Sequence, residues 1–281
     1  MAEKCFFDEI IECLETEKNK RGTAFVQPEV LQEFFSDRPA AAEPLKRKPA
    51  PAEFSPAPAR HSQPSAAPAD RESFQPAPAP ASRQSAPAAK IAVENLSLTE
   101  LRAVALNCRQ CKLHSKRNTV VFGEGNPHAE LMFIGEGPGM EEDQQGRHFV
   151  GAAGQLLDKM ILAMGFKRED VYIANIVKCR PPNNRNPEED EATLCLPYLK
   201  RQIELVSPKV IVVLGAVPML WLTGKTGIMK LRGQWTEYQG IKLMPTYHPA
   251  YLLRNAGAKK DVWSDLQQVM QVFGKTYQKP G

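Results

Sequence analysis

The sequence predicts an α/β fold in which a parallel β-sheet lies between layers of helices. From about residue 91 onward, short apolar runs alternate with helical patterns, and this alternation is typical of parallel sheets. One run, VIVVLG at 210–215, is rich in β-branched residues, as expected for a strand that is buried on both faces. The chain also has 24 prolines, which is too many for one compact domain and indicates that part of it is linker.

The elements of this α/β region are predicted one by one from local patterns. The first is a helix from Ser97 to about Asn107, because SLTE has the pattern of a capping box between Ser97 and Glu100. We expect four strands, LMFIG (131–135), VYIANIV (171–177), VIVVLG (210–215) and KLMPTYH (242–248), and two further helices, QLLDKMILAMG (155–165) and NPEEDEATLCLPYLKRQIELV (186–206). The last helix is expected to begin at an Asn186 cap, with Pro187 in its first turn.

Two segments precede this domain, which we place at 91–281. Residues 39–90 hold half of all the prolines and sixteen alanines, and such a composition favours a mostly disordered, extended tether. Residues 1–38 form a short amphipathic segment with apolar residues at helical spacing. This segment is either a frayed pair of helices or an element that docks on a protein partner.

Charge and hydropathy limit where the protein acts. The net charge is +4, with an acidic N-terminal segment and a mildly basic domain that permits a polyanionic partner without proving one. No apolar run approaches the roughly 20 residues that a membrane span needs, and the first residues do not form a secretory signal. We therefore expect a cytoplasmic monomer with no membrane contact.

Polar residues gather where the predicted strands end. The loop GEGPGMEEDQQGRHFVGAAG (135–154) leaves a buried strand and carries Glu136, Glu142 and Phe149. Asn175 and His248 also lie at strand ends, and in parallel sheets ligands bind beyond the carboxyl ends of the strands. Each residue has a plain alternative when taken alone: a turn, a surface charge, a core aromatic, a cap or a structural histidine.

Four of the six cysteines form a second pattern. Cys108 and Cys111 make a C-x2-C pair, and Cys179 and Cys195 follow with 15 residues between them. In a reducing compartment, cysteines are more often ligands or core residues than disulfides. Four thiolates suit either a zinc ion or an iron–sulfur cluster, and the wide second pair mildly favours the cluster.

Taken together, four motifs resemble the family 4 uracil-DNA glycosylases, the iron–sulfur branch of that superfamily. These are GEGPGMEED with GRHFVG, VYIANIVKCRPPNNRNP, LRGQW and HPAYLLRN. The resemblance runs from about residue 98 to 273 and does not reach residues 1–90. It implies a three-layer α/β/α sandwich with a central four-stranded parallel sheet, a structural [4Fe-4S] cluster and no catalytic metal.

The resemblance also implies roles for individual residues. The cluster ligands would be Cys108, Cys111, Cys179 and Cys195. The uracil pocket would be formed by Glu136, Gly137, Phe149, Asn175 and His248. Of these, Asn175 would read the base edge and His248 would lie beside uracil O2. Glu136 would stabilise the sugar and orient water, with Glu142 as the second candidate for this catalytic role.

The remaining predictions concern DNA. Arg180, Asn184, Arg185, Arg232 and Arg254 are candidate phosphate contacts, although surface solvation would explain each one alone. His148 stands where the family usually has a proline before the stacking aromatic, so the loop is expected to be looser or His148 to reach a phosphate. PPNNRNP replaces the basic insertion of relatives that trap uracil-DNA covalently, which favours a turnover enzyme.

The predicted function is therefore release of free uracil from DNA, which leaves an abasic site and starts base-excision repair. Two alternatives remain open at this point. One is a catalytically weak DNA-binding module associated with replication, and the other is a zinc protein of the same fold.

Overall fold

A computed structural model of the chain describes residues 93–275. The predicted N-terminal segment and Pro/Ala-rich linker lie outside the described residues, so their boundaries stay predictions. Within the described part, six strands form one sheet in the order β1-β3-β2-β4-β6-β5. None of the helices in this part is long and apolar enough to cross a membrane.

The four central strands of the sheet are parallel, as predicted. They are β3 (Tyr172–Asn175), β2 (Leu131–Gly135), β4 (Val210–Leu214) and β6 (Ile241–Thr246). Short strands β1 (Glu124–Gly125) and β5 (Thr236–Tyr238) add antiparallel edges. These edges were not predicted, because two or three residues are too short to show the alternation that marks a strand.

Helices and single turns connect the strands. The α-helices are α3 (Leu98–Leu106), α4 (Met140–Gln145), α5 (Ala152–Ala163), α6 (Glu189–Val206), α7 (Ala216–Thr223), α8 (Ile228–Leu231), α9 (Pro249–Leu252) and α10 (Lys259–Val272). The 3-10 turns are η1 (Lys112–Ser115), η2 (Arg168–Asp170), η3 (Pro182–Asn184) and η4 (Ala256–Ala258).

The helix ends test the predicted caps. Ser97 and Glu100 form the expected capping box at α3, and Gly165, with φ of 75°, follows the end of α5 as a left-handed stop. The Asn186 cap was wrong, because α6 begins at Glu189 with Glu188 as its N-cap. The backbone N–H of Glu188 donates to Glu191 Oε2 at 2.8 Å, so the capping box starts two residues later than expected and Pro187 precedes the helix.

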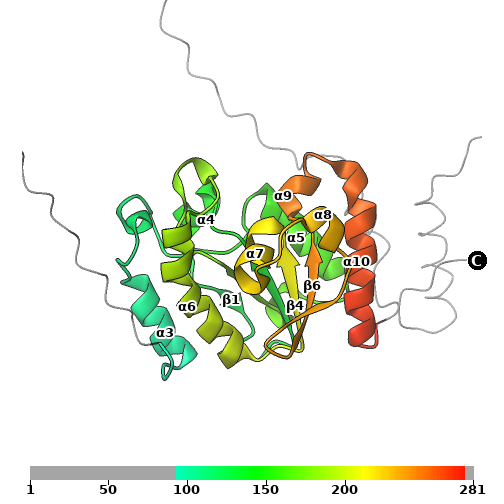
Figure 1. Cartoon of the computed structure of the whole chain (residues 1–281), viewed down its shortest axis with the longest axis horizontal. Coiled ribbons are helices and arrows are strands. Elements are labelled where there is room, and N and C mark those ends of the chain that lie inside the picture. Colours follow the sequence, from blue (N-terminus) through cyan, green and yellow to red (C-terminus); the bar gives the residue numbers. More distant parts are fainter. Residues whose placement is uncertain (1–92, 276–281) are drawn as a thin grey trace, which may run out of the picture. The chain divides into compact units, whose positions relative to one another are not determined.

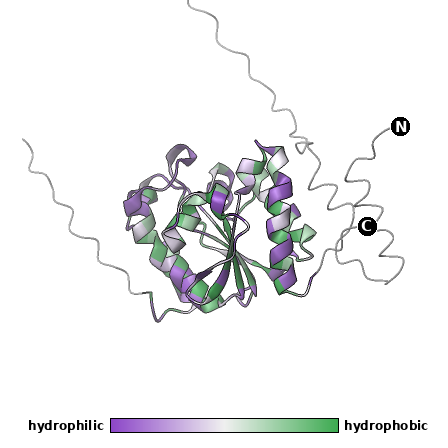
Figure 2. Cartoon of the chain, turned by 45° about the vertical axis from the view of Figure 1, so that its right-hand side comes forward, coloured by the Kyte–Doolittle hydropathy of each residue, from purple (hydrophilic) through white to green (hydrophobic). Residues whose placement is uncertain are grey.

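Helices cover both faces of the sheet and form the predicted three layers (Figure 1). One face of the sheet packs against α5, α9 and α10, and the other packs against α3, α6 and α7. Successive residues of β2 serve opposite cores: Phe133 belongs to the first and Met132 to the second. Figure 2 shows the hydrophobic strands enclosed between helices whose outer sides are largely hydrophilic. Burial on both faces explains why the central strands appear in the sequence as continuous apolar runs.

Candidate active site

A pocket of about 430 Å³ opens at the carboxyl ends of the parallel strands. Strands β2 and β3 end at the register pair Gly135 and Asn175, and β6 ends two residues before His248. The pocket is lined by all the predicted uracil-pocket residues, Glu136, Gly137, Phe149, Asn175 and His248, together with Glu142. The structure therefore brings together residues that are more than 110 positions apart in the chain.

Gly135 allows the pocket wall formed by Asn175 and Phe149 to close. A Cβ atom at this position would lie 2.5 Å from Asn175 Oδ1 and 2.8 Å from Phe149 Cζ. These contacts are shorter than side chains tolerate, so a larger residue would push the amide and the ring away from the strand end. Glycine at the end of β2 thus lets Asn175 and Phe149 meet directly above it.

Phe149 is held in a conformation that non-glycine residues seldom adopt. Its φ is 48°, which is left-handed backbone, and its side chain is buried. Gly154 makes room for this bend, because a Cβ atom there would lie 1.8 Å from the carbonyl oxygen of Phe149. The Phe149 and His248 ring centroids are 5.8 Å apart, with 32° between the planes.

Glu142 anchors the loop that carries Phe149. Its Oε1 accepts hydrogen bonds from the backbone N–H groups of Val150 at 2.8 Å and Gly151 at 3.0 Å. Its Oε2 accepts from the backbone N–H of Gly139 at 3.1 Å, at the start of α4. Both carboxylate oxygens are thus engaged by the backbone on the two sides of the loop, which limits the looseness expected from the missing proline.

Glu136 follows β2 directly and differs from Glu142 in its surroundings. No donor among the described residues bonds to its carboxylate, and burial raises its pKa from 4.5 to about 7. It therefore changes charge near neutral pH. A partly buried carboxyl group with a pKa near the working pH is typical of groups that take part in reactions.

His248 has a defined tautomer. It caps α9, and its Nδ1 accepts a hydrogen bond from the backbone N–H of Ala250 at 3.1 Å. Burial, helped by the positive charge of Arg254, lowers its pKa to about 4. At neutral pH the imidazole is therefore neutral, and because Nδ1 accepts, the proton is on Nε2.

Asn175 ends β3 and is almost fully buried. Its side-chain Oδ1 has no hydrogen-bond partner within the described part of the chain, although its backbone carbonyl accepts from Lys178 Nζ at 2.8 Å. A buried amide oxygen without a partner is unusual in a folded protein. Because Asn175 also lines the pocket, a ligand is the natural partner for this atom.

His148 lies away from solvent, so the idea that it reaches a phosphate was wrong. Only 1% of the residue is exposed, and burial together with Lys178 and Arg168 puts the pKa of its ring well below the usual value. Its backbone is also held, since its N–H donates to Glu124 at 3.3 Å and its carbonyl accepts from Arg168 at 2.5 Å. The side chain fills the interior beneath the Phe149 loop.

The candidate phosphate contacts are separated by the structure into two groups. Asn184, Arg185 and Arg254 line the pocket, and Arg180 donates to Asn184 Oδ1 at 2.7 Å beside it. Arg232 does not line the pocket. Its guanidinium pairs with buried Asp265.

The four predicted cluster ligands surround one small cavity of about 20 Å³. Cys108 and Cys111 flank the turn after α3, Cys179 follows β3, and Cys195 lies on α6. All four are free thiols. Burial raises the pKa of Cys179 to about 11 and that of Cys195 to about 12, so these sulfurs would stay protonated at neutral pH without a cation to bind.

The surroundings of the sulfurs fit a bound cluster. Arg117 Nη1 donates to Cys179 Sγ at 3.2 Å, and the backbone N–H of Lys178 donates to Cys195 Sγ at 3.3 Å. Hydrogen bonds to sulfur are a common feature of iron–sulfur sites. Among the described residues, no three His, Cys, Asp or Glu side chains are arranged to hold a single metal ion. The four thiols line this one cavity.

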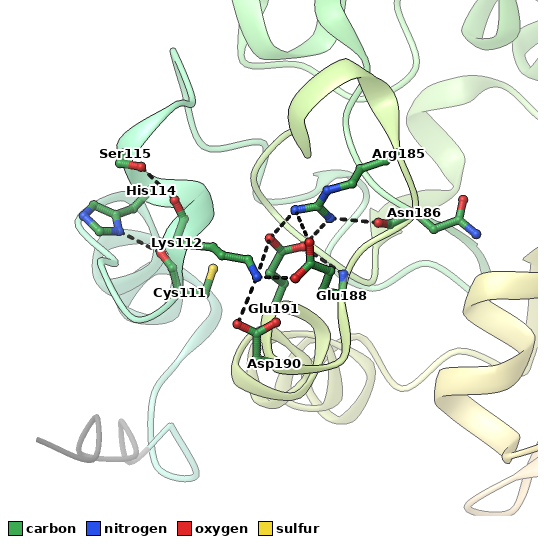
Figure 3. A network of polar contacts seen from close by, with 9 residues as sticks. All are labelled: Cys111, Lys112, His114, Ser115, Arg185, Asn186, Glu188, Asp190 and Glu191. Carbon is green, nitrogen blue, oxygen red and sulfur yellow. Dashed lines mark hydrogen bonds and ion pairs between the residues drawn. The ribbon is translucent and has the colours of Figure 1, made fainter. Parts of the chain in front are cut away.

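Glu191 at the start of α6 connects this cysteine site with the pocket wall (Figure 3). Its carboxylate accepts two hydrogen bonds from Arg185, at 2.8 Å and 2.7 Å. Lys112, which follows Cys111, contacts Glu188 and Asp190 as well as Glu191. The loop that bears two cysteines and the loop that lines the pocket are thus fastened to the same turn of helix.

Sequence reasoning missed two residues of this arrangement, Glu191 and Lys178. A weak signal existed for each of them. Glu191 is the third residue after Glu188, as in a capping box, and Lys178 is a lysine between an apolar run and a cysteine. Neither pattern indicates these roles, because each residue also contacts a partner far away in the chain: Lys178 contacts Gln202, and Glu191 contacts Lys112.

Comparison with known proteins agrees with this geometry. The family model described as the uracil DNA glycosylase superfamily matches residues 122–267. A type-4 uracil-DNA glycosylase of Thermotoga maritima is 50% identical over 173 residues, which cover 60% of this chain and 90% of the relative. A type-4 enzyme of Sulfurisphaera tokodaii is 46% identical over 186 residues, or 63% of this chain and 84% of the relative. A type-5 uracil-DNA glycosylase of Pyrobaculum aerophilum is 30% identical over 186 residues, which cover 54% of this chain and 82% of the relative.

Proposed function

Because the chain belongs to the uracil DNA glycosylase superfamily and matches its type-4 enzymes most strongly among these relatives, we propose that it excises uracil from DNA. The reaction hydrolyses the bond between uracil N1 and deoxyribose C1′, which releases free uracil and leaves an abasic site. The observation that carries this proposal is the Asn175 amide oxygen, which finds no hydrogen-bond partner in the described part of the chain and lies in a pocket shared with Glu136 and His248.

Recognition of uracil begins with extrusion of the nucleotide from the DNA stack, which costs a few kcal/mol. Phe149 offers a ring face on which the flipped base stacks. The Asn175 side chain presents one acceptor and one donor, which match N3–H and O4 of uracil. Cytosine has the reverse pattern at these positions, so it would leave buried polar groups without partners.

Cleavage separates charge, and the pocket has a group for each sign. As the N1–C1′ bond breaks, uracil becomes negative and the sugar becomes positive. The Nε2–H of neutral His248 donates to uracil O2, while ionised Glu136 stabilises the sugar and orients the attacking water. The hydroxyl of that water ends on C1′ and its proton is left for the uracil. Each such interaction contributes about 2–4 kcal/mol to the transition state.

Glu142 remains the second candidate for the carboxylate role, but its contacts favour a positioning role. Three backbone N–H groups already occupy its oxygens. A carboxylate bound in this way holds the Phe149 loop in place. We therefore assign the chemistry to Glu136 and the geometry of the stacking ring to Glu142.

Uracil-containing DNA is the proposed partner of the pocket rim. Arg254, Asn184 and Arg185 line the pocket, and Arg180 is bonded to Asn184, so we propose these four as contacts to the phosphates on either side of the flipped nucleotide. Arg232 remains the weakest candidate, since its guanidinium already pairs with Asp265. Contacts of this kind do not depend on base sequence.

Cys108, Cys111, Cys179 and Cys195 are proposed to hold a [4Fe-4S] cluster with a structural role. When bound, the cluster supplies covalent links between the segment after α3, the end of β3 and α6. The charges that develop during cleavage have their own partners in Glu136 and His248. We therefore propose no step of the reaction for the cluster.

Residues 1–38 and the linker 39–90 are proposed as additions to a catalytic domain at 91–281. The apolar spacing of 1–38 supports a protein-docking role, and the segment lies outside the described residues. The domain is proposed to act as a cytoplasmic monomer. A full-length chain and a 91–281 chain with equal rates on uracil-DNA would support this division of roles.

The direct test is uracil release. Purified cluster-loaded protein is mixed with an oligonucleotide that carries one uracil, and free uracil and the abasic product are measured. We expect turnover with both products formed in equal amounts. Tight DNA binding without release would instead favour the catalytically weak binding module.

A change at Asn175 tests base reading. Asn175→Asp should lower the rate on uracil and raise relative activity on cytosine, because a protonated carboxyl or a carboxylate no longer presents the amide pattern. The measurement is the ratio of kcat/KM for U and C in the same DNA context. An unchanged ratio would remove Asn175 from base reading, and Asn183→Asp on the neighbouring exposed loop serves as the matched control.

A further inference from the structure

Lys178 is a lysine buried between the two sites described above. It is 2% exposed and ranks among the largest fully buried side chains. Its Nζ donates to the backbone carbonyl of Asn175 at 2.8 Å and to Gln202 Oε1 at 2.6 Å. Lysine is seldom fully buried, so this position calls for an explanation beyond packing.

The second acceptor, Gln202, is itself fixed. Its Nε2 donates to the carbonyl of Phe122 at 2.8 Å and to the hydroxyl of Tyr172 at 3.1 Å, and the residue is fully buried on α6. The lysine nitrogen therefore has a defined position. Because this nitrogen donates to the Asn175 carbonyl, its bond to Gln202 also helps to hold that carbonyl in place.

The other side of Lys178 faces the cysteine site. It lines the cavity that the four cysteines surround, and its backbone N–H donates to Cys195 Sγ. No carboxylate among the residues that the structure describes pairs with its ammonium. Both hydrogen-bond acceptors of its Nζ are neutral oxygens, so the fixed position of this nitrogen depends on these two bonds.

We propose that Lys178 is a positioning residue whose bonds to the Asn175 carbonyl and to Gln202 hold the end of β3 so that the Asn175 amide meets uracil. The inference rests on the proposed function and deepens it. It also links the two sites, because the residue whose Nζ donates to the Asn175 carbonyl donates its backbone N–H to Cys195 Sγ. A merely structural lysine would affect cluster content and folding but not base selectivity in protein that has folded and loaded.

The experiment uses the full chain with its cluster and compares wild type with Lys178→Met, which keeps an unbranched side chain as long as the lysine stem and removes the terminal donors. Only protein with wild-type iron content and visible absorption is assayed. We expect kcat/KM on single-uracil DNA to fall about 100-fold, as expected for a small misplacement of a reading group. The U-to-C selectivity should fall with it, while affinity for DNA with an abasic-site analogue stays within about 2-fold.

The matched control is Tyr172→Phe. This variant removes the hydroxyl that accepts a hydrogen bond from Gln202. Tyr172 lies on β3, as Asn175 does, and belongs to the same hydrogen-bond network, but its hydroxyl is not bonded to Asn175. Its kcat/KM and selectivity should stay within about 3-fold of wild type. If it lost as much selectivity as Lys178→Met, any damage to the network would produce the effect and the specific role of Lys178 would be rejected.

Other outcomes also decide the matter. The inference would be overturned if cluster-loaded Lys178→Met had the kcat/KM and U-to-C selectivity of wild type. It would also be overturned if the variant lost affinity for abasic DNA as strongly as it lost kcat/KM.

If Lys178→Met does not bind a cluster, Gln202→Leu serves as the second variant, because it removes the other acceptor of the lysine. This variant should lower U-to-C selectivity several-fold, and unchanged selectivity would again overturn the inference. Failure of wild type to release uracil would instead reject the proposed function.

Discussion

The proposed uracil pocket and the cysteine site lie at the same end of the β3 segment but are built in opposite ways. The pocket has a volume of about 430 Å³ and contains groups without a hydrogen-bond partner in residues 93–275, such as Asn175 Oδ1 and the Glu136 carboxylate. The cysteine cavity has only about 20 Å³ and gathers four thiols from three parts of the chain. A site for a passing substrate leaves hydrogen-bonding capacity unused, whereas a site for a resident group closes around it.

The two sites also share segments, which makes their separation testable. Residues 175–179 run from the Asn175 amide, for which we propose base reading, to Cys179, and α6 carries both Cys195 and the Glu191 contact to the pocket wall. If the comparison is right, damage to the cysteine site should affect folding and activity together. Damage to the pocket should affect activity alone.

The largest effect is expected from Cys195→Ser. A buried hydroxyl cannot replace a thiolate ligand, and binding energy of a structural group contributes directly to folding. Visible absorption and iron content should fall sharply, and the free energy of unfolding should drop by about 3 kcal/mol or more. Denaturant unfolding and iron analysis provide the measurements. Thr193→Ala, on the exposed side of the same helix, should change stability by less than about 0.5 kcal/mol, and a serine variant with normal iron would contradict the assignment.

The next largest effect is expected from His248→Ala, which breaks the pocket alone. Loss of the Nε2–H donor should lower kcat about 100- to 1000-fold, while affinity for abasic DNA changes little. Single-turnover rates and DNA titrations separate the two quantities. A parallel loss of rate and DNA affinity would show that His248 is structural.

Glu136 sharpens the comparison through pH. Because its pKa is raised from 4.5 to about 7 and the reaction needs the ionised form, kcat/KM should rise as pH increases through about 7. The titration of His248 should not change kcat/KM above pH 5, since its pKa is about 4. Glu136→Gln should lower the rate about 100-fold and remove this rise, and a pH profile that keeps the rise would assign it to another group.

The same variant has an opposite effect on stability. A carboxyl whose pKa is higher in the folded protein favours unfolding as pH rises from about 4.5 to 7, because the unfolded chain loses its proton first. Above pH 7 the full penalty remains. Glu136→Gln should therefore raise the unfolding midpoint by a few degrees at pH 8 and leave it unchanged at pH 4. A lower midpoint at pH 8 would show that the carboxylate is stabilised by contacts instead.

The smallest effect is expected at the rim. Arg254→Ala should weaken DNA binding several-fold and reduce the salt slope by about one unit, as expected for loss of one phosphate contact. Arg102→Ala removes an exposed arginine from α3, away from the pocket-lining residues, and should leave both quantities unchanged. Titrations at several salt concentrations compare the two variants, and equal effects would mean that Arg254 acts only through overall charge.

Much of the fold was predictable because its signals are local. The four parallel strands are apolar runs, α3 starts at a four-residue capping pattern, and α5 stops before Gly165 at positive φ. The start of α6 was misplaced because Asn186 looks like a cap, yet the competing bond from Glu188 to Glu191 decides where the helix begins. The short edge strands β1 and β5 were not predicted, because they form by pairing with β3 and β6 and have no strand pattern of their own.

The sequence by itself determined the order of the strands along the chain, the motifs at their carboxyl ends and the four cysteines, since each of these is a matter of residue type and spacing. Only the tertiary structure decided what the charged residues do. Arg232 is bound by Asp265, 33 positions away, and Lys178 by Gln202, 24 positions away. A charge acts on whatever folding places within a few ångströms of it, and nothing in its near sequence specifies that neighbour.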